Sequence, residues 1–199
     1  MTVDVPLWEA EETGVPSVFA EKPRETGPVG TVSAPLFEVK VYGAPAPQGS
    51  KSAKRNRHTG RIQLVESSRA VGPWREHVVA AALRARPRGW KPITEPVAVE
   101  MVFTLTRPRS HFGTGRNAAV VRPSSPALPA SVPDLSKLAR STEDALTTAA
   151  VYRDDALVVE YRRLVKRYHT DHGLVPDVME ASGCVIRLWP VVGAGVPGG

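Results

Sequence analysis

The segment Asp134–Ala149 constrains the fold more than any other, because its apolar side chains recur at the spacing of an amphipathic helix. At about 100° per residue, apolar and small side chains fall on one face and polar side chains on the other. The apolar face consists of Leu135, Leu138, Ala139, Thr142, Ala145, Leu146 and Ala149. The polar face consists of Ser136, Lys137, Arg140, Glu143, Asp144 and Thr147. Such a helix must bury its apolar face, so we expect it to pack on a sheet.

Other regular elements are predicted on both sides of this helix. Apolar and polar residues alternate along Phe37–Tyr42 and along Val97–Thr106, which is the period of a half-buried strand. The remaining predicted elements are a helix over Trp74–Ala85 and strands over Leu157–Tyr168 and Cys184–Trp189. The order β-α-β-α-β-β predicts an α+β fold, with a small mixed sheet of about four strands and two helices.

Proline and glycine confine the predicted core to the middle of the chain. The 19 prolines and 16 glycines among 199 residues exceed average use, so long loops or tails should accompany the core. Residues 1–33 mix acids, prolines and glycines without periodicity and predict a flexible acidic leader, and residues 191–199 predict a flexible tail. The folded domain is expected over residues 34–190. Within it, the polar stretch Arg107–Pro133 has no predicted element, and loops of this length are usually functional or mobile.

Charge is unevenly distributed along the chain. The net charge is +6, yet the first 36 residues carry six acids against two bases, so the rest of the chain is strongly basic. A basic body is typical of proteins that bind a polyanion, and a merely soluble basic surface is the alternative. The segment Ser50–Arg61 contains no acid and predicts a basic loop or hairpin that follows phosphates. The cations expected to bind those phosphates are Lys51, Lys54, Arg55, Arg57, Arg61 and, on the helix, Lys137.

A single cysteine and the lack of a long apolar run indicate in which cellular compartment the protein is expected. Cys184 has no partner for an intramolecular disulfide, which fits a reducing compartment. No stretch approaches the roughly 18 apolar residues of a membrane span, and the N-terminus carries acids where a signal peptide needs a basic start. We therefore expect a soluble cytoplasmic protein that does not bind membranes.

Carboxylates concentrate in and directly after the predicted helix. A strand that returns along the helix would bring the turn at Asp154 and Asp155 beside the polar helix face, where Glu143 and Asp144 lie. Clustered carboxylates repel one another unless a cation neutralises them, and hard oxygen ligands suit Mg²⁺ or Mn²⁺. Beside a basic surface, this cluster predicts metal-assisted phosphodiester hydrolysis, in which the metal activates a water and stabilises charge on the phosphoryl oxygens.

Each acid also has a structural alternative. Asp134 follows Pro133 and is a good helix N-cap. Glu143 and Asp144 could sit on a solvated face and balance Arg140. The two aspartates of the turn could be turn formers.

A different metal is an alternative near the end of the chain. His169 and His172, followed by Cys184, supply three side chains that bind zinc in proteins. No fourth donor is obvious, and the spacing matches no standard zinc module. Zinc therefore stays an alternative to the carboxylate site.

The acids also form a pattern that resembles the RusA-like Holliday junction resolvases, a family common in phages and prophages. The family core reads Asp-x-Asp-Asn-Leu-x-Lys, then Asp-Ala-Leu, then Asp-Asp before a long strand. In register and without gaps, this chain has Asp134-Leu-Ser136-Lys137-Leu138-Ala-Arg140, then Asp144-Ala-Leu146, then Asp154-Asp155. The opening strand with Gly43-Ala-Pro45-Ala-Pro47 and the helix from Trp74 also fit, so the resemblance covers about residues 37–190.

The resemblance implies a homodimeric, Mg²⁺-dependent endonuclease that cuts four-way DNA junctions symmetrically. Asp134 falls on the first catalytic aspartate of the family and Asp155 on the later one. Asp144 and Asp154 match acids that commonly stand beside them, so the implied metal ligands are these four aspartates. The cations of Ser50–Arg61 would then contact DNA.

Two positions depart from the family pattern. The second aspartate of Asp-x-Asp is Ser136, and the family lysine is Arg140, which keeps a positive charge for phosphate as a planar fork. Glu143 lies two turns after Ser136 and only about 20° around the helix axis. We expect Glu143 to supply the missing negative charge, directly or through water. The alternatives are a degenerate junction-binding protein that does not cut, and a basic assembly protein that binds a protein partner through its acidic leader.

Overall fold

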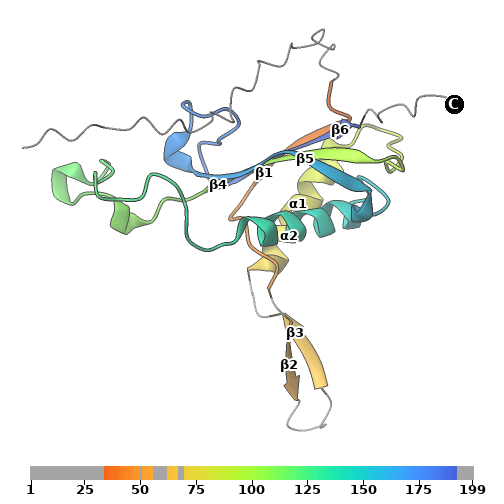
Figure 1. Cartoon of the computed structure of the whole chain (residues 1–199), viewed down its shortest axis with the longest axis horizontal. Coiled ribbons are helices and arrows are strands. Elements are labelled where there is room, and N and C mark those ends of the chain that lie inside the picture. Colours follow the sequence, from red (N-terminus) through yellow and green to blue (C-terminus); the bar gives the residue numbers. More distant parts are fainter. Residues whose placement is uncertain (1–33, 50, 56–61, 67–69, 192–199) are drawn as a thin grey trace, which may run out of the picture. The chain divides into compact units, whose positions relative to one another are not determined.

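The chain is described here by a computed structural model over residues 34–49, 51–55, 62–66 and 70–191 (Figure 1). The strands are β1 (Phe37–Tyr42), β2 (Lys51–Arg55), β3 (Ile62–Glu66), β4 (Val97–Leu105), β5 (Val158–Tyr168) and β6 (Gly183–Pro190). The helices are α1 (Val71–Ala85) and α2 (Leu135–Thr148). The predicted leader at residues 1–33 and almost all of the predicted tail lie outside the described residues. No helix in the described part is long and apolar enough to cross a membrane.

Four strands form one mixed sheet in the order β1-β6-β4-β5. The pairs β1–β6 and β6–β4 are antiparallel, whereas β4 and β5 are parallel. Parallel neighbours need a long crossover connection, and α2 lies within the one that joins β4 to β5. The prediction of an α+β fold with a four-stranded mixed sheet and two helices is confirmed.

Both helices pack on the same face of this sheet (Figure 1). Along β1, Phe37, Val39 and Val41 are buried toward the helices, and the residues between them are exposed, as the alternation predicts. The indole nitrogen of Trp74 on α1 donates a hydrogen bond to Thr142 Oγ1 on α2 at 3.1 Å. Burial of this large side chain at 1% exposure, with its single polar atom satisfied, fixes the two helices against each other.

The structure adds two strands, β2 and β3, to the predicted order. The basic segment predicted as a loop or hairpin is a hairpin, in which β2 pairs with β3 in antiparallel register. The prediction ended this segment at Arg61 and so missed β3, whose five residues are too short for a clear periodicity. Helix α1 begins at Val71, ahead of the predicted Trp74, because Pro73 in the first helical turn needs no intrahelical N–H bond.

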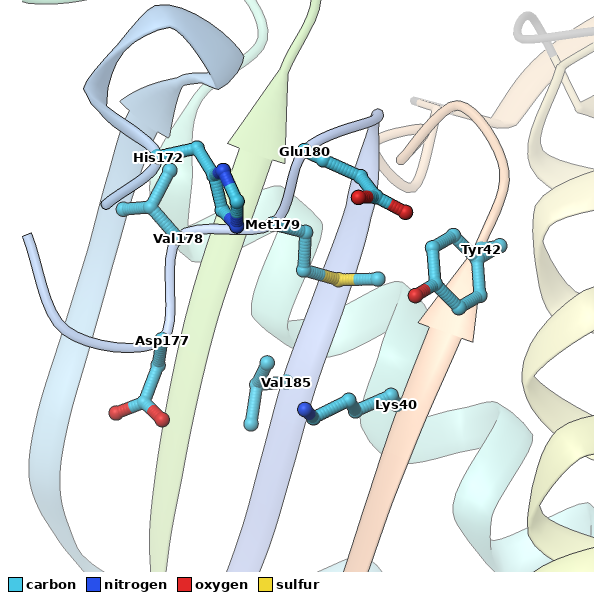
Figure 2. A pocket seen from close by; sticks show the side chains of 8 residues that line it. All are labelled: Lys40, Tyr42, His172, Asp177, Val178, Met179, Glu180 and Val185. Carbon is cyan, nitrogen blue, oxygen red and sulfur yellow. The ribbon is translucent and has the colours of Figure 1, made fainter.

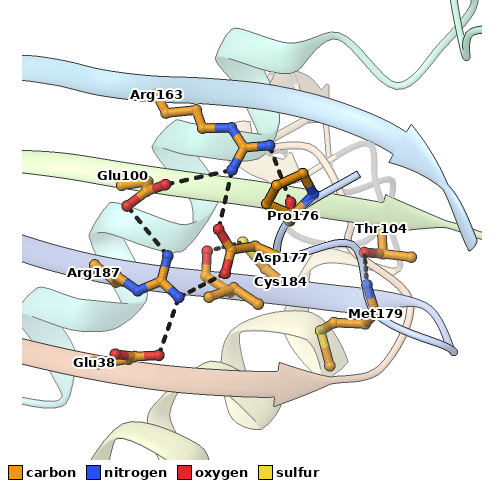
Figure 3. A network of polar contacts seen from close by, with 10 residues as sticks. Glu38, Glu100, Thr104, Arg163, Pro176, Asp177, Met179, Cys184 and Arg187 are labelled. Atoms are coloured by element: carbon orange, nitrogen blue, oxygen red, sulfur yellow. Dashed lines mark hydrogen bonds and ion pairs between the residues drawn. The ribbon is translucent and has the colours of Figure 1, made fainter. Parts of the chain in front are cut away.

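The sheet face opposite the helices is crossed by a network of ion pairs (Figure 3). Arg187 on β6 lies 2.6 Å from Asp177 and 3.3 Å from both Glu38 and Glu100. Arg163 on β5 lies 3.0 Å from the second oxygen of Asp177. The hydrogen bond from Arg187 holds the pKa of Asp177 below its usual range against the effect of burial, and the charges of both arginines lower it further. The network thus joins the segment between β5 and β6 to all four strands of the sheet.

We expect Asp177→Asn to lower the free energy of unfolding by about 1 kcal/mol at neutral pH, because two arginines lose their carboxylate. Asparagine tolerates the left-handed backbone at this position, where φ is 65°, so the change removes charge without backbone strain. The folded-state pKa lies below the unfolded one, so this stability is complete above the unfolded pKa and is lost as pH falls through the folded one. Urea unfolding at neutral pH and at about pH 3 measures the difference.

The matched control is Glu180→Gln, which neutralises an exposed carboxylate for which the described residues offer no cation partner. It should leave the free energy of unfolding unchanged at both pH values. A deficit of the Asp177 variant that stays the same in acid would contradict the assignment of this stability to the ionised carboxylate.

Candidate functional site

Glu143 lies near the middle of α2 and is only 8% exposed, although its side chain is ionisable. The hydroxyl of Tyr161 on β5 donates a hydrogen bond to Glu143 Oε1. The hydroxyl of Tyr152 donates to the backbone carbonyl of Glu143 at 3.1 Å. The alternative that placed Glu143 on a solvated face is therefore wrong, because β5 and the turn before it cover this part of the polar face.

The charges around Glu143 define the site electrostatically. Burial raises the pKa of Glu143, and the hydrogen bond from Tyr161 lowers it. The negative charges of Asp155 and Asp144 raise this pKa, while the positive charge of Arg140 lowers it. Burial and the contact with Glu143 raise the pKa of Tyr161, so its hydroxyl remains a neutral donor. Three charged groups and one tyrosine thus influence the carboxylate of Glu143.

Asp144, the next residue, is engaged with α1. Arg75 donates a hydrogen bond from Nη2 to Asp144 Oδ2, and Nη2 also lies 3.1 Å from Gln48 Oε1. The backbone N–H of Gln48 donates to the carbonyl oxygen of Lys137 at 3.0 Å. The segment between β1 and β2 is therefore attached to α2 beside the acids.

Asp134 lies at the opposite end of the helix. It occupies the N-cap position, but its side chain makes no capping hydrogen bond and instead pairs with Lys137 at 3.0 Å. The capping alternative is therefore wrong for this residue. Nine residues separate Asp134 from Glu143, which is about 13.5 Å along a helix axis. Both Asp134 and Lys137 are exposed.

The two aspartates of the turn before β5 differ in their contacts. Asp154 Oδ1 accepts a hydrogen bond from the backbone N–H of Ala156 at 2.9 Å, so Asp154 is the turn former that the sequence allows. Asp155 is exposed, and its negative charge acts on Glu143, Tyr152 and Tyr161. Of the two aspartates, Asp155 is therefore the one whose charge affects Glu143 and Tyr161.

The donor chemistry of Glu143 and Asp155 fits a magnesium ion. Mg²⁺ is commonly held by one or two carboxylates, with water and substrate phosphate oxygens as the other ligands. Burial is the main cause of the raised pKa of Glu143, and the negative charge of Asp155 raises it further; a bound cation would favour the ionised form of both carboxylates. In the described ranges, however, no group of three or more Asp, Glu, His or Cys side chains is arranged to hold a metal.

The same finding bears on the zinc alternative. Cys184 is fully buried in β6, and burial raises the pKa of its thiol well above the ordinary value, whereas zinc binds the thiolate. His169 accepts a hydrogen bond from the backbone N–H of Arg107 at its Nδ1. These side chains and His172 do not form a metal-binding group among the described residues, so the zinc alternative is wrong.

Of the predicted phosphate-binding residues, Lys51, Lys54 and Arg55 lie on β2 of the hairpin. Arg57 and Arg61 fall outside the described residues. The chain leading into the hairpin is held on α2, because the hydroxyl of Ser141 donates to the carbonyl of Ala46 at 2.7 Å.

Tyr161 is the residue of this site that the sequence did not reveal. Two register shifts in the β4–β5 pairing set Tyr161 opposite Val99 but Arg163 opposite Glu100. Strict alternation would put Tyr161 and Arg163 on one face, whereas the structure directs Tyr161 to α2 and Arg163 to the ion pairs of the other face. The aromatic residue six positions after Asp155 was the only available signal.

A cavity of about 330 Å³ lies on the face of the sheet opposite the helices (Figure 2). Its lining includes Lys40, Tyr42, His172, Asp177 and Glu180. Asp177 is already bound to two arginines there. Because α2 covers the other face, this cavity is separate from the acids of α2, which form the candidate site.

A buried carboxylate with a raised pKa, near an exposed aspartate and an exposed arginine, is typical of a functional site. Comparison with protein families shows which family the chain resembles: residues 43–175 match the family described as Endodeoxyribonuclease RusA. Because the match spans more than half of the 199 residues, the chain belongs to the RusA family, whose members act on branched DNA junctions. A search of curated proteins finds no match.

The contact between Arg75 and Asp144 generates a prediction about stability. We expect Arg75→Gln and Asp144→Asn each to lower the free energy of unfolding, and their double-mutant cycle to give a coupling energy of about 0.5–1 kcal/mol, because each side chain is about 30% exposed. Urea unfolding of the four proteins measures this coupling. Arg75→Gln combined with Asp154→Asn is the control and should be additive. Additivity of the first pair as well would show that the ion pair does not stabilise the fold.

Proposed function

We propose that the protein is a Holliday junction resolvase that hydrolyses two symmetrically placed phosphodiester bonds of a four-way DNA junction with Mg²⁺, for which Mn²⁺ can substitute. The observation that carries this proposal is a buried carboxylate, Glu143, on which the charges of Asp155 and Arg140 act, in a domain of the RusA family. Burial of one carboxylate near another is unfavourable. Groups perturbed in this way cluster at active sites, where function maintains them.

The proposed site assigns separate roles in metal binding, carboxylate orientation and phosphate binding to its residues. Glu143 and Asp155 would hold the magnesium ion, which when bound supplies an activated water and neutralises charge on the phosphoryl oxygens. Tyr161 orients Glu143 through its hydrogen bond and excludes water from one carboxylate oxygen. Arg140 is exposed one turn before Glu143 and would bind the scissile phosphate through its planar guanidinium.

The remaining acids belong to the proposal through the family pattern. Asp134 matches the first catalytic aspartate of the family, and Asp144 and Asp154 match its neighbours. Asp144 already has a cation partner in Arg75, and Asp154 already accepts a backbone hydrogen bond. We therefore assign the principal metal-holding role to Glu143 and Asp155.

The dimer and the cellular location complete the proposal. A four-way junction has two-fold symmetry, and symmetric cutting calls for two active sites related by a two-fold axis, so we propose a homodimer. The basic hairpin with Lys51, Lys54 and Arg55 would bind phosphates of the junction arms. We also propose that the protein acts on DNA in the cytoplasm of a bacterial host and that it is of phage or prophage origin.

We expect Asp155→Asn and Glu143→Gln each to reduce cutting of a labelled four-way junction by about 100-fold or more, which corresponds to about 2.7 kcal/mol. Binding of the junction should be retained or strengthened, because each change removes negative charge facing phosphate. Single-turnover cleavage and gel-shift titration measure the two properties. Glu160→Gln, an exposed carboxylate on β5, is the control and should cut normally.

Two outcomes would contradict this proposal. If Asp155→Asn cuts at the wild-type rate, the site assignment is wrong. If the wild type binds junctions without cutting and Ser136→Asp creates activity, the chain is the degenerate binding protein. If Glu143 compensates for Ser136, Ser136→Asp should instead restore part of the cutting that Glu143→Gln removes.

A further inference from the structure

The connection between β4 and α2 carries positive charge that the proposed site does not use. Residues 107–133, here called the arginine arm, contain four arginines and one histidine but no aspartate or glutamate. Three of these arginines are exposed: Arg109, Arg116 and Arg122. Among the described residues, none of the three has a carboxylate partner. A folded loop that presents only positive charge is suited to a polyanion.

The outer part of the arm has a defined shape. Phe112 and Val121 form an antiparallel bridge, and Gly113 donates from its N–H to the carbonyl oxygen of Val120 at 2.9 Å. A Cβ at Gly113 would come within 2.6 Å of the carbonyl oxygen of Asn117, so this tight turn requires glycine. The guanidinium of Arg109 donates to the carbonyl of Ala118 at 3.2 Å, which orients it along the arm.

The fourth arginine holds the base of the arm instead of facing solvent. Arg107 is only 6% exposed, and its guanidinium lies 4.1 Å from the ring centroid of Tyr168. It donates to Thr170 Oγ1 at 3.0 Å and to the carbonyl of Pro126 at 2.9 Å. Arg107, at the start of the arm, thus holds the later segment at Pro126 against the end of β5 and the turn after it.

The far end of the arm leads directly into the catalytic helix. Lys166 Nζ lies 2.7 Å from the carbonyl oxygen of Ser131 and 2.8 Å from that of Pro133. The next residue is Asp134, at the N-terminus of α2. The exposed arginines are therefore presented by a segment whose two ends are both fixed next to the helix that carries the acids. Preorganisation of this kind lowers the entropic cost of binding.

We propose that the arginine arm is a second DNA-binding surface, in which Arg109, Arg116 and Arg122 contact backbone phosphates of a junction arm. Arg107 acts as a positioning residue and does not touch DNA. The inference rests on the proposed function, since it takes branched DNA as the ligand. Contacts of guanidinium groups to phosphates add affinity that is independent of sequence and sensitive to salt.

The test replaces Arg109, Arg116 and Arg122 together with glutamine in the full chain and measures binding of a four-way junction against salt concentration, without Mg²⁺ so that nothing is cut. The slope of log K against log salt is negative, and it should become shallower by up to about 0.9 for each phosphate that the variant no longer binds. The control replaces three exposed cations at the end of α1 and beyond it, Arg84, Arg88 and Lys91, with glutamine. It removes the same charge and should leave the slope unchanged.

An unchanged slope in the arm variant, or an equal decrease in the control, would overturn the proposal, because the arm would then make no local contact with DNA. Thermal melting of both variants establishes that they fold. The proposed function is judged separately on the wild type: if it neither binds nor cuts the junction, that proposal fails before the arm is tested.

Discussion

Docking of α2 between α1 and β5 is the constraint on which the site depends. Trp74 and Thr142 join the two helices through a buried hydrogen bond, while Tyr161 reaches from β5 to the carboxylate of Glu143. Because β5 runs back along α2 in a parallel pair with β4, the turn before it brings Asp155 to Glu143. The crossover topology therefore sets Asp155 near Glu143, and a shift of α2 relative to β5 would separate the two.

The sequence predicted the scaffold better than the site. The apolar face of α2 is buried almost as its periodicity indicates, since Leu138, Ala145 and Leu146 are nearly inaccessible. The polar face was misjudged because periodicity identifies which face must be buried but not which polar residues a neighbouring strand will cover. Glu143 is buried for this reason, with a hydrogen bond from Tyr161 of β5 that a helix pattern cannot reveal. The register shifts in the β4–β5 pairing also cannot be predicted from the sequence, and without them the position of Tyr161 beside α2 could not be inferred.

Cations occur in three separate parts of the chain: the β2–β3 hairpin, the exposed face of α2 at Arg140, and the arginine arm. All three lie within residues 43–175, the range that matches the RusA family, whereas β1 and β6 lie entirely outside it. The strands outside the match contribute to the ion pairs of the opposite face, where Arg187 holds Asp177 and Glu38. The helix-covered face of the sheet thus carries the proposed site, and the other face carries the ion pairs.

The central claim is that Glu143 and Asp155 hold the metal ion. A crystal structure of the protein grown with Mn²⁺, with the ion located by its anomalous scattering, tests it most directly. We expect an anomalous peak within coordination distance of a carboxylate oxygen of each residue, and loss of that peak in Glu143→Gln. A peak at Asp134 alone, with Glu143 still bound only to Tyr161, would contradict the claim.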